Sequence, residues 1–232
     1  MIHGYKSIFF DFDDTLWDTY HNNRECLEEI FFDYQFDRYY DSFETFFQLY
    51  MPNNLALWKK YRNHEIDRQT LILERFLYIF RPMGITDNEF ILRFNRDFLQ
   101  RTTTKTKLIP GAMELLDYLK PSYRLFILSN GFREIQVQKL KNSNLADYFD
   151  KIILSEDAEI QKPHKEIFDF ALKNTNSRRN ESLMIGDCYE ADIEGAFHAK
   201  IDQLWFNPDH LPCKKIIPTF QVRTLDEIQG IL

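Results

Sequence analysis

An apolar run that ends in three carboxylates, residues 8–16, constrains the fold of this chain more than any other stretch. It reads Ile-Phe-Phe-Asp-Phe-Asp-Asp-Thr-Leu. A short apolar run of this kind is typical of a buried strand. Its carboxylates would then lie at the carboxyl end of that strand, where open α/β sheets bind their ligands. Because crowded negative charge is unfavourable without compensation, the cluster predicts a bound cation, and a divalent ion that prefers oxygen ligands is the simplest one.

The periodicity of apolar residues divides the chain into two parts. In residues 17–106, apolar side chains recur at helical spacing, with breaks expected at residues 51–54 and 81–84. Residues 107–232 instead alternate short apolar strands with helices, which indicates a parallel sheet covered by helices on both faces. We therefore predict an α/β protein: a Rossmann-like parallel-sheet core of residues 1–16 and 107–232, with an α-helical bundle domain of residues 17–106 inserted after the first strand.

The expected elements of the core follow from short apolar runs and from proline. After the first strand, further strands are expected at residues 124–128, 151–154, 182–185, 203–207 and 220–222. Pro110 and Pro163 are expected to open helices, because proline is tolerated at the first helical position. Polar side chains stand at or near the ends of these elements: Asp11 and Asp13, Ser129 and Asn130, Lys162, and Asp187. In a parallel sheet such groups converge on one edge.

The charge and composition exclude several classes of function. The chain carries 29 Lys and Arg against 36 Asp and Glu, a net charge of −7, without the basic patch typical of nucleic-acid binding. No apolar run approaches the roughly 18 residues of a transmembrane helix. Three widely separated cysteines fit a reducing cytoplasm better than a disulfide framework. We therefore expect a cytoplasmic monomer or homodimer that binds a small molecule rather than a nucleic-acid polymer or a membrane.

The chain resembles the haloacid dehalogenase-like (HAD) hydrolase superfamily in four ordered motifs. These are residues 11–15 (DFDDT), 128–131 (LSNG), 162–163 (KP), and 186–187 (GD) with Asp192. The match spans the predicted core in order, spacing and placement at strand ends. It implies the HAD fold, with the helical insertion as a cap domain.

Within this superfamily the chain is similar to the nucleotidase-like branch, which acts on nucleoside monophosphates. The finer resemblance rests on residues 108–112, 129–132, 147–150, 162–169 and 204–207. Two positions depart from the family pattern, since Asp14 and Lys200 stand where relatives often carry glycine. We expect Asp14 to serve a turn or to face solvent, and Lys200 to alter only a local turn.

The resemblance assigns catalytic roles, and each is chemically reasonable. Asp11 would be the nucleophile that forms an aspartyl-phosphate, so that one hard displacement becomes two easier ones. Asp13 would be the general acid for the leaving oxygen and then the general base for water. Lys162 would neutralise the phosphate and hold Asp11. The hydroxyl of Ser129 and the backbone N–H groups around Asn130 would bind phosphate oxygens.

The resemblance also implies Mg²⁺ as the cofactor. The carboxylates of Asp11 and Asp187 and the backbone carbonyl of Asp13 would bind it, which agrees with the few protein carboxylates that Mg²⁺ uses. Asp192 would act through water or by orienting other ligands. The expected function is that of a Mg²⁺-dependent phosphomonoester hydrolase, a phosphatase, whose substrate is a nucleoside 5′-monophosphate or a similar small phosphate ester.

Three other functions are alternatives. A phosphomutase would pass the phosphoryl group to a sugar hydroxyl, but such relatives favour glycine where this chain has Asp14. A 2-haloacid dehalogenase needs neither a metal nor a leaving-group acid, so Asp13 and Asp187 oppose it. A non-catalytic binding module has no need for the full set of nucleophile, acid, lysine and metal carboxylates.

Specificity for the base of a nucleotide would come largely from the helical insertion. Four aromatic rings are candidates for stacking on the base: Trp17, Phe46, Phe47 and Trp58.

Overall fold

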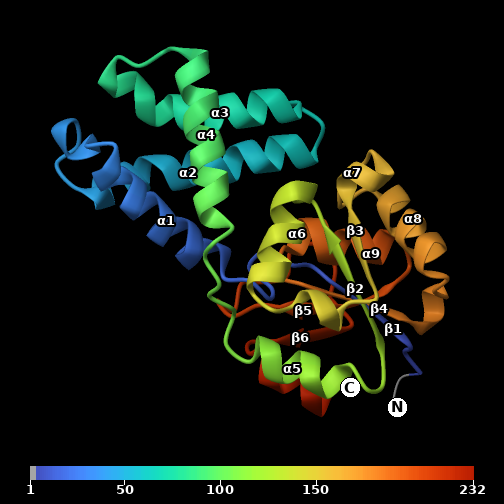
Figure 1. The fold of residues 1–232 in the computed structure, drawn as a ribbon. Coiled ribbons are helices and arrows are strands. Elements are labelled where there is room, and N and C mark those ends of the chain that lie inside the picture. The colour runs from blue at the N-terminus through green and yellow to red at the C-terminus, as the bar shows by residue number, and fades with distance from the viewer. Residues whose placement is uncertain (1–3) are drawn as a thin grey trace. The chain divides into compact units, whose positions relative to one another are not determined.

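The computed structural model describes residues 4–232 and divides the chain into two compact units (Figure 1). The core unit comprises residues up to Thr19 together with Thr106–Leu232, and the helical unit comprises Tyr20–Lys105. The first three residues of the predicted range 1–16 lie outside the described residues. The sequence placed the boundaries after residues 16 and 106, whereas contacts place them after Thr19 and Lys105.

The core unit is built on one six-stranded sheet in which every strand is parallel to its neighbours. The strands, in chain order, are β1 (Ser7–Phe10), β2 (Arg124–Ser129), β3 (Lys151–Leu154), β4 (Ser182–Gly186), β5 (Asp202–Phe206) and β6 (Phe220–Val222). Their order across the sheet is β3-β2-β1-β4-β5-β6. Phe10 of the central strand stands opposite Ile127 on one side and Ile185 on the other. The predicted α/β class with a parallel sheet is confirmed.

Helices cover both faces of this sheet. They are α5 (Ala112–Leu119), α6 (Arg133–Asn142), α7 (Ser155–Ala158), α8 (Lys165–Thr175) and α9 (Gly195–His198), with short helices η3 (Ala146–Tyr148), η4 (Arg179–Glu181), η5 (Tyr189–Glu194) and η6 (Leu225–Gly230). Successive side chains of a strand point to opposite faces. Accordingly, Phe10 packs in an apolar cluster with Leu115 of α5, and Phe9 packs in a second cluster with Ile167 of α8. Burial on both faces explains why β1 is apolar throughout.

The predicted starts of two helices are wrong by two residues. Helix α5 begins at Ala112 rather than Pro110, because Gly111 has a left-handed backbone (φ 85°) that interrupts a right-handed helix. Helix α8 begins at Lys165 rather than Pro163, because His164 is still extended. In both cases the proline lies in the turn before the helix.

The helical unit contains four α-helices and two short 3₁₀-helices. They are α1 (Thr19–Asp33, which begins at the last residue of the core unit), η1 (Phe36–Arg38), α2 (Phe43–Arg62), α3 (Arg68–Phe80), η2 (Arg81–Met83) and α4 (Asn88–Thr102). The break predicted at residues 81–84 is confirmed and ends at Gly84, whose φ is 72°. The break predicted at residues 51–54 is wrong, since α2 continues through Pro52. Tyr50 and Leu57 are buried on either side of this proline, so packing outweighs the lost backbone hydrogen bond.

Aromatic side chains form the interior of the helical unit. Phe46, Phe76 and Phe94 are fully buried there, and Phe76 meets Phe94 edge-on at a centroid distance of 4.8 Å. Phe47 belongs to the same cluster, and Trp17 is fully buried in the core unit. Three of the four rings proposed for stacking are therefore packing residues.

Two inferences from composition can be compared with the structure. Within residues 4–232 there is no helix whose length and apolar character would allow it to cross a bilayer. The three cysteines form no disulfide with one another, and Cys26 is buried, Cys188 partly exposed and Cys213 exposed. The cytoplasmic location that the cysteines suggested stays a prediction.

Candidate active site

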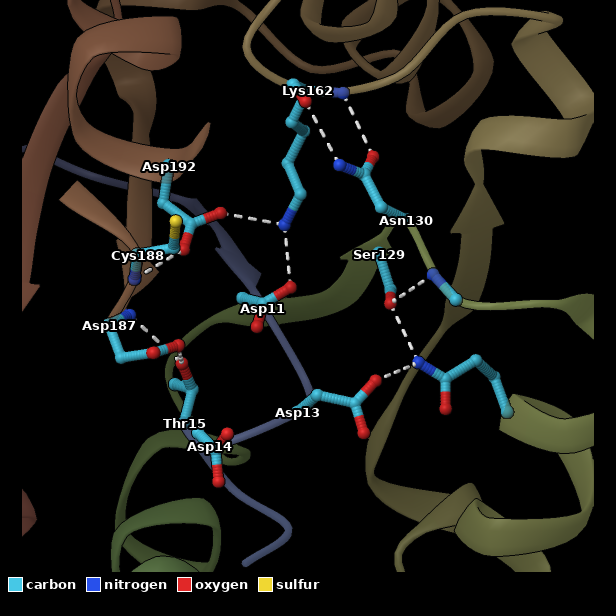
Figure 2. A network of polar contacts seen from close by, with 12 residues as sticks. Asp11, Asp13, Asp14, Thr15, Ser129, Asn130, Lys162, Asp187, Cys188 and Asp192 are labelled. Atoms are coloured by element: carbon cyan, nitrogen blue, oxygen red, sulfur yellow. Dashed lines mark hydrogen bonds and ion pairs between the residues drawn. The ribbon is translucent and has the colours of Figure 1, made fainter. Parts of the chain in front are cut away.

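The carboxyl ends of three neighbouring strands bring the predicted site residues together (Figure 2). Asp11 and Asp13 follow β1, Ser129 is the last residue of β2, and Asp187 follows β4. Lys162 reaches the same place from the turn before α8, and its ammonium group lies between carboxylates in Figure 2. This convergence is what the parallel arrangement of the strands requires.

Lys162 is buried between two carboxylates. Its Nζ atom lies 2.6 Å from Oδ1 of Asp11 and 2.7 Å from Oδ1 of Asp192, and only 1% of the residue is exposed. Burial alone would lower the pKa of the Lys162 ammonium, but the two carboxylates raise it above its usual value. Lys162 is therefore a fixed positive charge against Asp11 and not a solvated lysine.

The Asp192 side chain is fully buried, and both of its carboxylate oxygens accept hydrogen bonds. One of its oxygens accepts from Lys162, and the other accepts the backbone N–H of Cys188 at 3.0 Å. Gly186 makes room for it, because a Cβ atom at position 186 would lie 2.3 Å from Oδ2 of Asp192. Asp192 sits in η5, which is a π-helix, a form often found at functional sites.

Asp11, Asp187 and Asp192 form a compact acidic cluster. One carboxylate oxygen from each lies within 4.8 Å of the others. Burial raises the pKa of Asp11 to about 7 despite Lys162, and Asp192 adds to this rise. Burial raises the pKa of Asp187 well above its usual range, with further contributions from Asp11, Asp14 and Asp192. Neighbouring carboxylates thus disfavour ionisation of Asp11 and of Asp187, and a bound cation would offset this effect.

Thr15 orients Asp187 through two hydrogen bonds. The Thr15 hydroxyl donates to Oδ1 of Asp187 at 2.9 Å and accepts the backbone N–H of Asp187 at 3.1 Å. The indole N–H of Trp205 donates to the backbone carbonyl of Asp187 at 2.8 Å. Thr15 belongs to the first motif, but its orienting role was not predicted from the sequence.

The donor set of the cluster fits Mg²⁺. Carboxylate oxygens are the hard ligands that this ion takes, and it uses few of them. Both oxygens of Asp192 accept an N–H group, whereas in Asp11 and Asp187 only Oδ1 accepts a hydrogen bond from residues 4–232, so these two carboxylates are the better placed to offer an oxygen. The supporting role of Asp192 stays a prediction. Coordination by the backbone carbonyl of Asp13 stays a prediction.

Asn130 ties the end of β2 to the turn that carries Lys162. Its side chain donates to the backbone carbonyl of Lys162 at 2.9 Å and accepts the backbone N–H of Lys162 at 2.8 Å. The side chain is thus a clamp, which leaves only backbone groups near Asn130 for phosphate. The Ser129 hydroxyl oxygen accepts the backbone N–H of Gly131 at 3.1 Å.

Asp13 accepts hydrogen bonds from three side chains, none of which was predicted from the sequence. Lys139 Nζ lies 2.7 Å from its Oδ1, Gln136 Nε2 lies 2.6 Å from its Oδ2, and the Thr19 hydroxyl donates to Oδ1 at 2.9 Å. Burial raises the pKa of Asp13, but Lys139 and the other donors lower it more, so the carboxylate form is favoured. Gln136 and Lys139 are three residues apart on α6 and share one helix face, which was the available signal.

Asp14 occupies a turn with a left-handed backbone. Its φ is 58°, and its backbone N–H donates to the carbonyl of Trp17 at 2.8 Å and to the hydroxyl of Thr19 at 3.1 Å. Glycine tolerates this conformation best, so an aspartate here is held in a backbone conformation that few other residues adopt. The backbone supports the expected turn role.

The fold and this arrangement of acids define a hydrolase of one known family. Residues 8–206 match the haloacid dehalogenase-like hydrolase family, and the chain belongs to it. The resemblance read from the four sequence motifs is thereby confirmed.

Three similar proteins span nearly the whole chain. The pyrimidine 5′-nucleotidase YjjG of Escherichia coli is 32% identical over 97% of this chain and 96% of its own. The pyrimidine 5′-nucleotidase PynA of Streptococcus pneumoniae is 30% identical over 98% of this chain and 95% of its own. The crystal structure of the HAD-hydrolase YfnB of Bacillus subtilis bound to magnesium superimposes with a TM-score of 0.87, at 29% identity, over 98% of both chains.

Proposed function

We propose that this protein is a Mg²⁺-dependent phosphomonoester hydrolase that acts on nucleoside 5′-monophosphates, with pyrimidine nucleotides as the first candidates. The observation that carries the proposal is Asp11, held by the buried ammonium of Lys162 beside Asp187, with Asp13 two residues further on. Two relatives named pyrimidine 5′-nucleotidases support the substrate class. The magnesium-bound structure of YfnB supports the cofactor.

The proposed reaction has two steps, and Asp11 is covalently bound between them. In the first, a carboxylate oxygen of Asp11 bonds to phosphorus, the bond from phosphorus to the ester oxygen breaks, and Asp13 gives a proton to the leaving oxygen. In the second, water bonds to phosphorus, Asp13 takes its proton, and phosphate leaves Asp11. Lys162 and the Ser129 hydroxyl would balance the charge that spreads over the phosphoryl oxygens.

Asp11 and Asp187 would hold the Mg²⁺ ion in this proposal. When bound, Mg²⁺ supplies positive charge that favours the ionised forms of both carboxylates and neutralises phosphate oxygens. Thr15 would keep Asp187 oriented toward the ion, and Lys162 would keep Asp192 in place.

We also propose that the helical unit is the cap domain. The enzyme would work in the cytoplasm, as a monomer or homodimer.

The test is phosphate release from a panel of nucleotides and sugar phosphates, with Mg²⁺ and with EDTA. We expect turnover with Mg²⁺, loss with EDTA, and a preference for nucleoside 5′-monophosphates. Asp11→Asn should abolish turnover, and Asp209→Asn, at an exposed turn, should not. Full activity of Asp11→Asn, or of the wild type in EDTA, would rule the mechanism out. A preference for sugar phosphates with transfer to a sugar hydroxyl would favour the phosphomutase alternative, and metal-independent turnover of 2-chloropropionate would favour the dehalogenase.

A further inference from the structure

We propose that Gln136 and Lys139 of α6 are positioning residues that fix the orientation of the Asp13 carboxyl group for proton transfer, and that Gln136 links this orientation to the Ser129 hydroxyl. The inference rests on the proposed function, in which Asp13 exchanges a proton with the leaving oxygen and with water. Neither residue belongs to the four family motifs.

The two side chains grip different oxygens of the same carboxyl group. Lys139 Nζ is 2.7 Å from Oδ1 of Asp13, and Gln136 Nε2 is 2.6 Å from Oδ2. One contact would restrain only the position of the group, whereas contacts to both oxygens also restrain rotation about the last side-chain bond. Proton transfer depends on such orientation, because the donor must lie within hydrogen-bond reach of the reacting oxygen.

Lys139 is built into the site and is not a surface lysine that happens to lie nearby. Only 5% of it is exposed, and its Nζ lies 3.8 Å from the centre of the Trp17 ring. Trp17 is fully buried and stacks on Phe12, the neighbour of Asp13 in the chain. A buried ammonium requires compensation, which the carboxylate in front of it and the ring face beneath it supply.

The side chain of Gln136 fills a space that only a glycine at position 131 leaves open. A Cβ atom on Gly131 would lie 2.2 Å from Nε2 of Gln136. From this position the same Nε2 donates to Oδ2 of Asp13 and, at 2.8 Å, to the hydroxyl oxygen of Ser129. One amide therefore connects the proposed proton donor to a proposed phosphate ligand.

The side-chain amide of Gln136 does not serve to stabilise the fold. Its Oε1 atom is buried and has no hydrogen-bond partner among residues 4–232. A buried acceptor without a partner is unfavourable, so a residue selected only for packing would be apolar at this position. The N–H groups of the amide, which face Asp13 and Ser129, are what the site uses.

Leaving groups of different basicity separate this role from a structural one. An alkoxide, as in a nucleotide, must be protonated as it leaves, whereas p-nitrophenolate leaves without a proton. Loss of Asp13 orientation should therefore slow kcat/KM for a nucleoside monophosphate far more than for p-nitrophenyl phosphate. The ratio of the two values is measured on one preparation, so a partly unfolded variant does not change it.

The experiment compares Gln136→Leu and Lys139→Met with matched changes on exposed positions of the same helix, Gln138→Leu and Lys141→Met. We expect each site variant to lower kcat/KM for the nucleotide by at least about tenfold more than for the aryl ester, which is part of the roughly 10²–10⁴-fold that general acid catalysis contributes. The exposed variants should leave the ratio unchanged. In an Asp13→Asn background, neither site variant should change the ratio further, because both act through Asp13.

The outcomes distinguish the inference from the proposed function. If the wild type hydrolyses neither ester, both the proposed function and the inference about Gln136 and Lys139 are overturned. If the wild type is active and Asp13→Asn shifts the ratio while the Gln136 and Lys139 variants slow both esters equally, only the inference is overturned. The inference would also be overturned if the Gln136 and Lys139 variants changed the ratio of kcat/KM values in the Asp13→Asn background as much as they do in the wild type.

Discussion

Replacing Lys162 by methionine should strongly destabilise the core unit, and the structure gives the size of the effect. Methionine keeps the length and the apolar stem of the side chain but removes the ammonium group. That group lies 2.6 Å from Asp11 and 2.7 Å from Asp192, and 1% of the residue is exposed. Removing one partner of a buried ion pair leaves an uncompensated charge and costs about 3–5 kcal/mol.

An exposed ion pair on the same unit provides the matched control. Lys120 lies 3.0 Å from Asp150, but the two side chains are 37% and 43% exposed. Solvent and salt screen such a pair, so Lys120→Met should cost about 0–1 kcal/mol. The difference between the two variants isolates the effect of burial from the effect of losing a lysine.

The destabilisation of Lys162→Met should grow with pH. Burial already raises the pKa of Asp11 to about 7, and removing the ammonium removes an influence that lowers it. The folded variant then holds protons that the unfolded chain has released above its ordinary carboxyl pKa of about 4, so its stability falls as the pH rises. The loss should be smaller at pH 5 and larger at pH 8.

Urea unfolding followed by circular dichroism, in EDTA so that no divalent ion replaces the ammonium, measures this effect. The free energy of unfolding should fall by about 3–5 kcal/mol for Lys162→Met at pH 8. A loss within about 1 kcal/mol of the Lys120→Met control, or a loss that does not depend on pH, would refute the idea that this lysine offsets buried charge.

Three further predictions concern separate parts of the molecule. Thr15→Val should raise the Mg²⁺ concentration for half-maximal activity by about 10–100-fold, because Asp187 loses the group that orients it, whereas Thr15→Ser should not. Cys26 should react with a thiol reagent only on unfolding, and because burial raises its pKa to about 11, the folded state should lose stability as the pH rises from about 9 toward 11. Lys200→Gly should raise the free energy of unfolding by about 0.5–1 kcal/mol, because Lys200 has φ 57° and glycine relieves that strain. Asn176→Gly, at φ 50°, should gain less, since asparagine tolerates this backbone conformation. Thermal or urea unfolding measures both variants.

The sheet could be predicted from the sequence because buried parallel strands are short apolar runs. The expected strand at residues 220–222 coincides with β6, and that at residues 151–154 coincides with β3. Pro52 shows where such reasoning stops. A local rule says that proline breaks a helix, but packing of the aromatic interior keeps α2 continuous, and the sequence does not show that packing in advance.

The candidate site divides in the same way. The topology of the sheet alone brings Asp11, Asp187 and Ser129 to one edge, so strand-end residues could be named in advance. Gln136 and Lys139 share a helix face, but the sequence does not show that this face meets Asp13, because their contacts depend on the rotation of α6 about its axis and on the space that a glycine leaves. Supporting residues that neither end a strand nor belong to a family motif require coordinates.

The position of β1 has a consequence for how the protein is made. This strand leaves the ribosome before either of its neighbours in the sheet, which begin only at Arg124 and Ser182. At about 5–20 residues per second, its first partner follows after on the order of ten seconds. We expect the helical unit, which has an apolar interior of its own, to collapse during that interval. The nascent chain thus carries an unpaired apolar segment during that interval, and the surroundings of Asp11 are complete only after Asp192 has been translated.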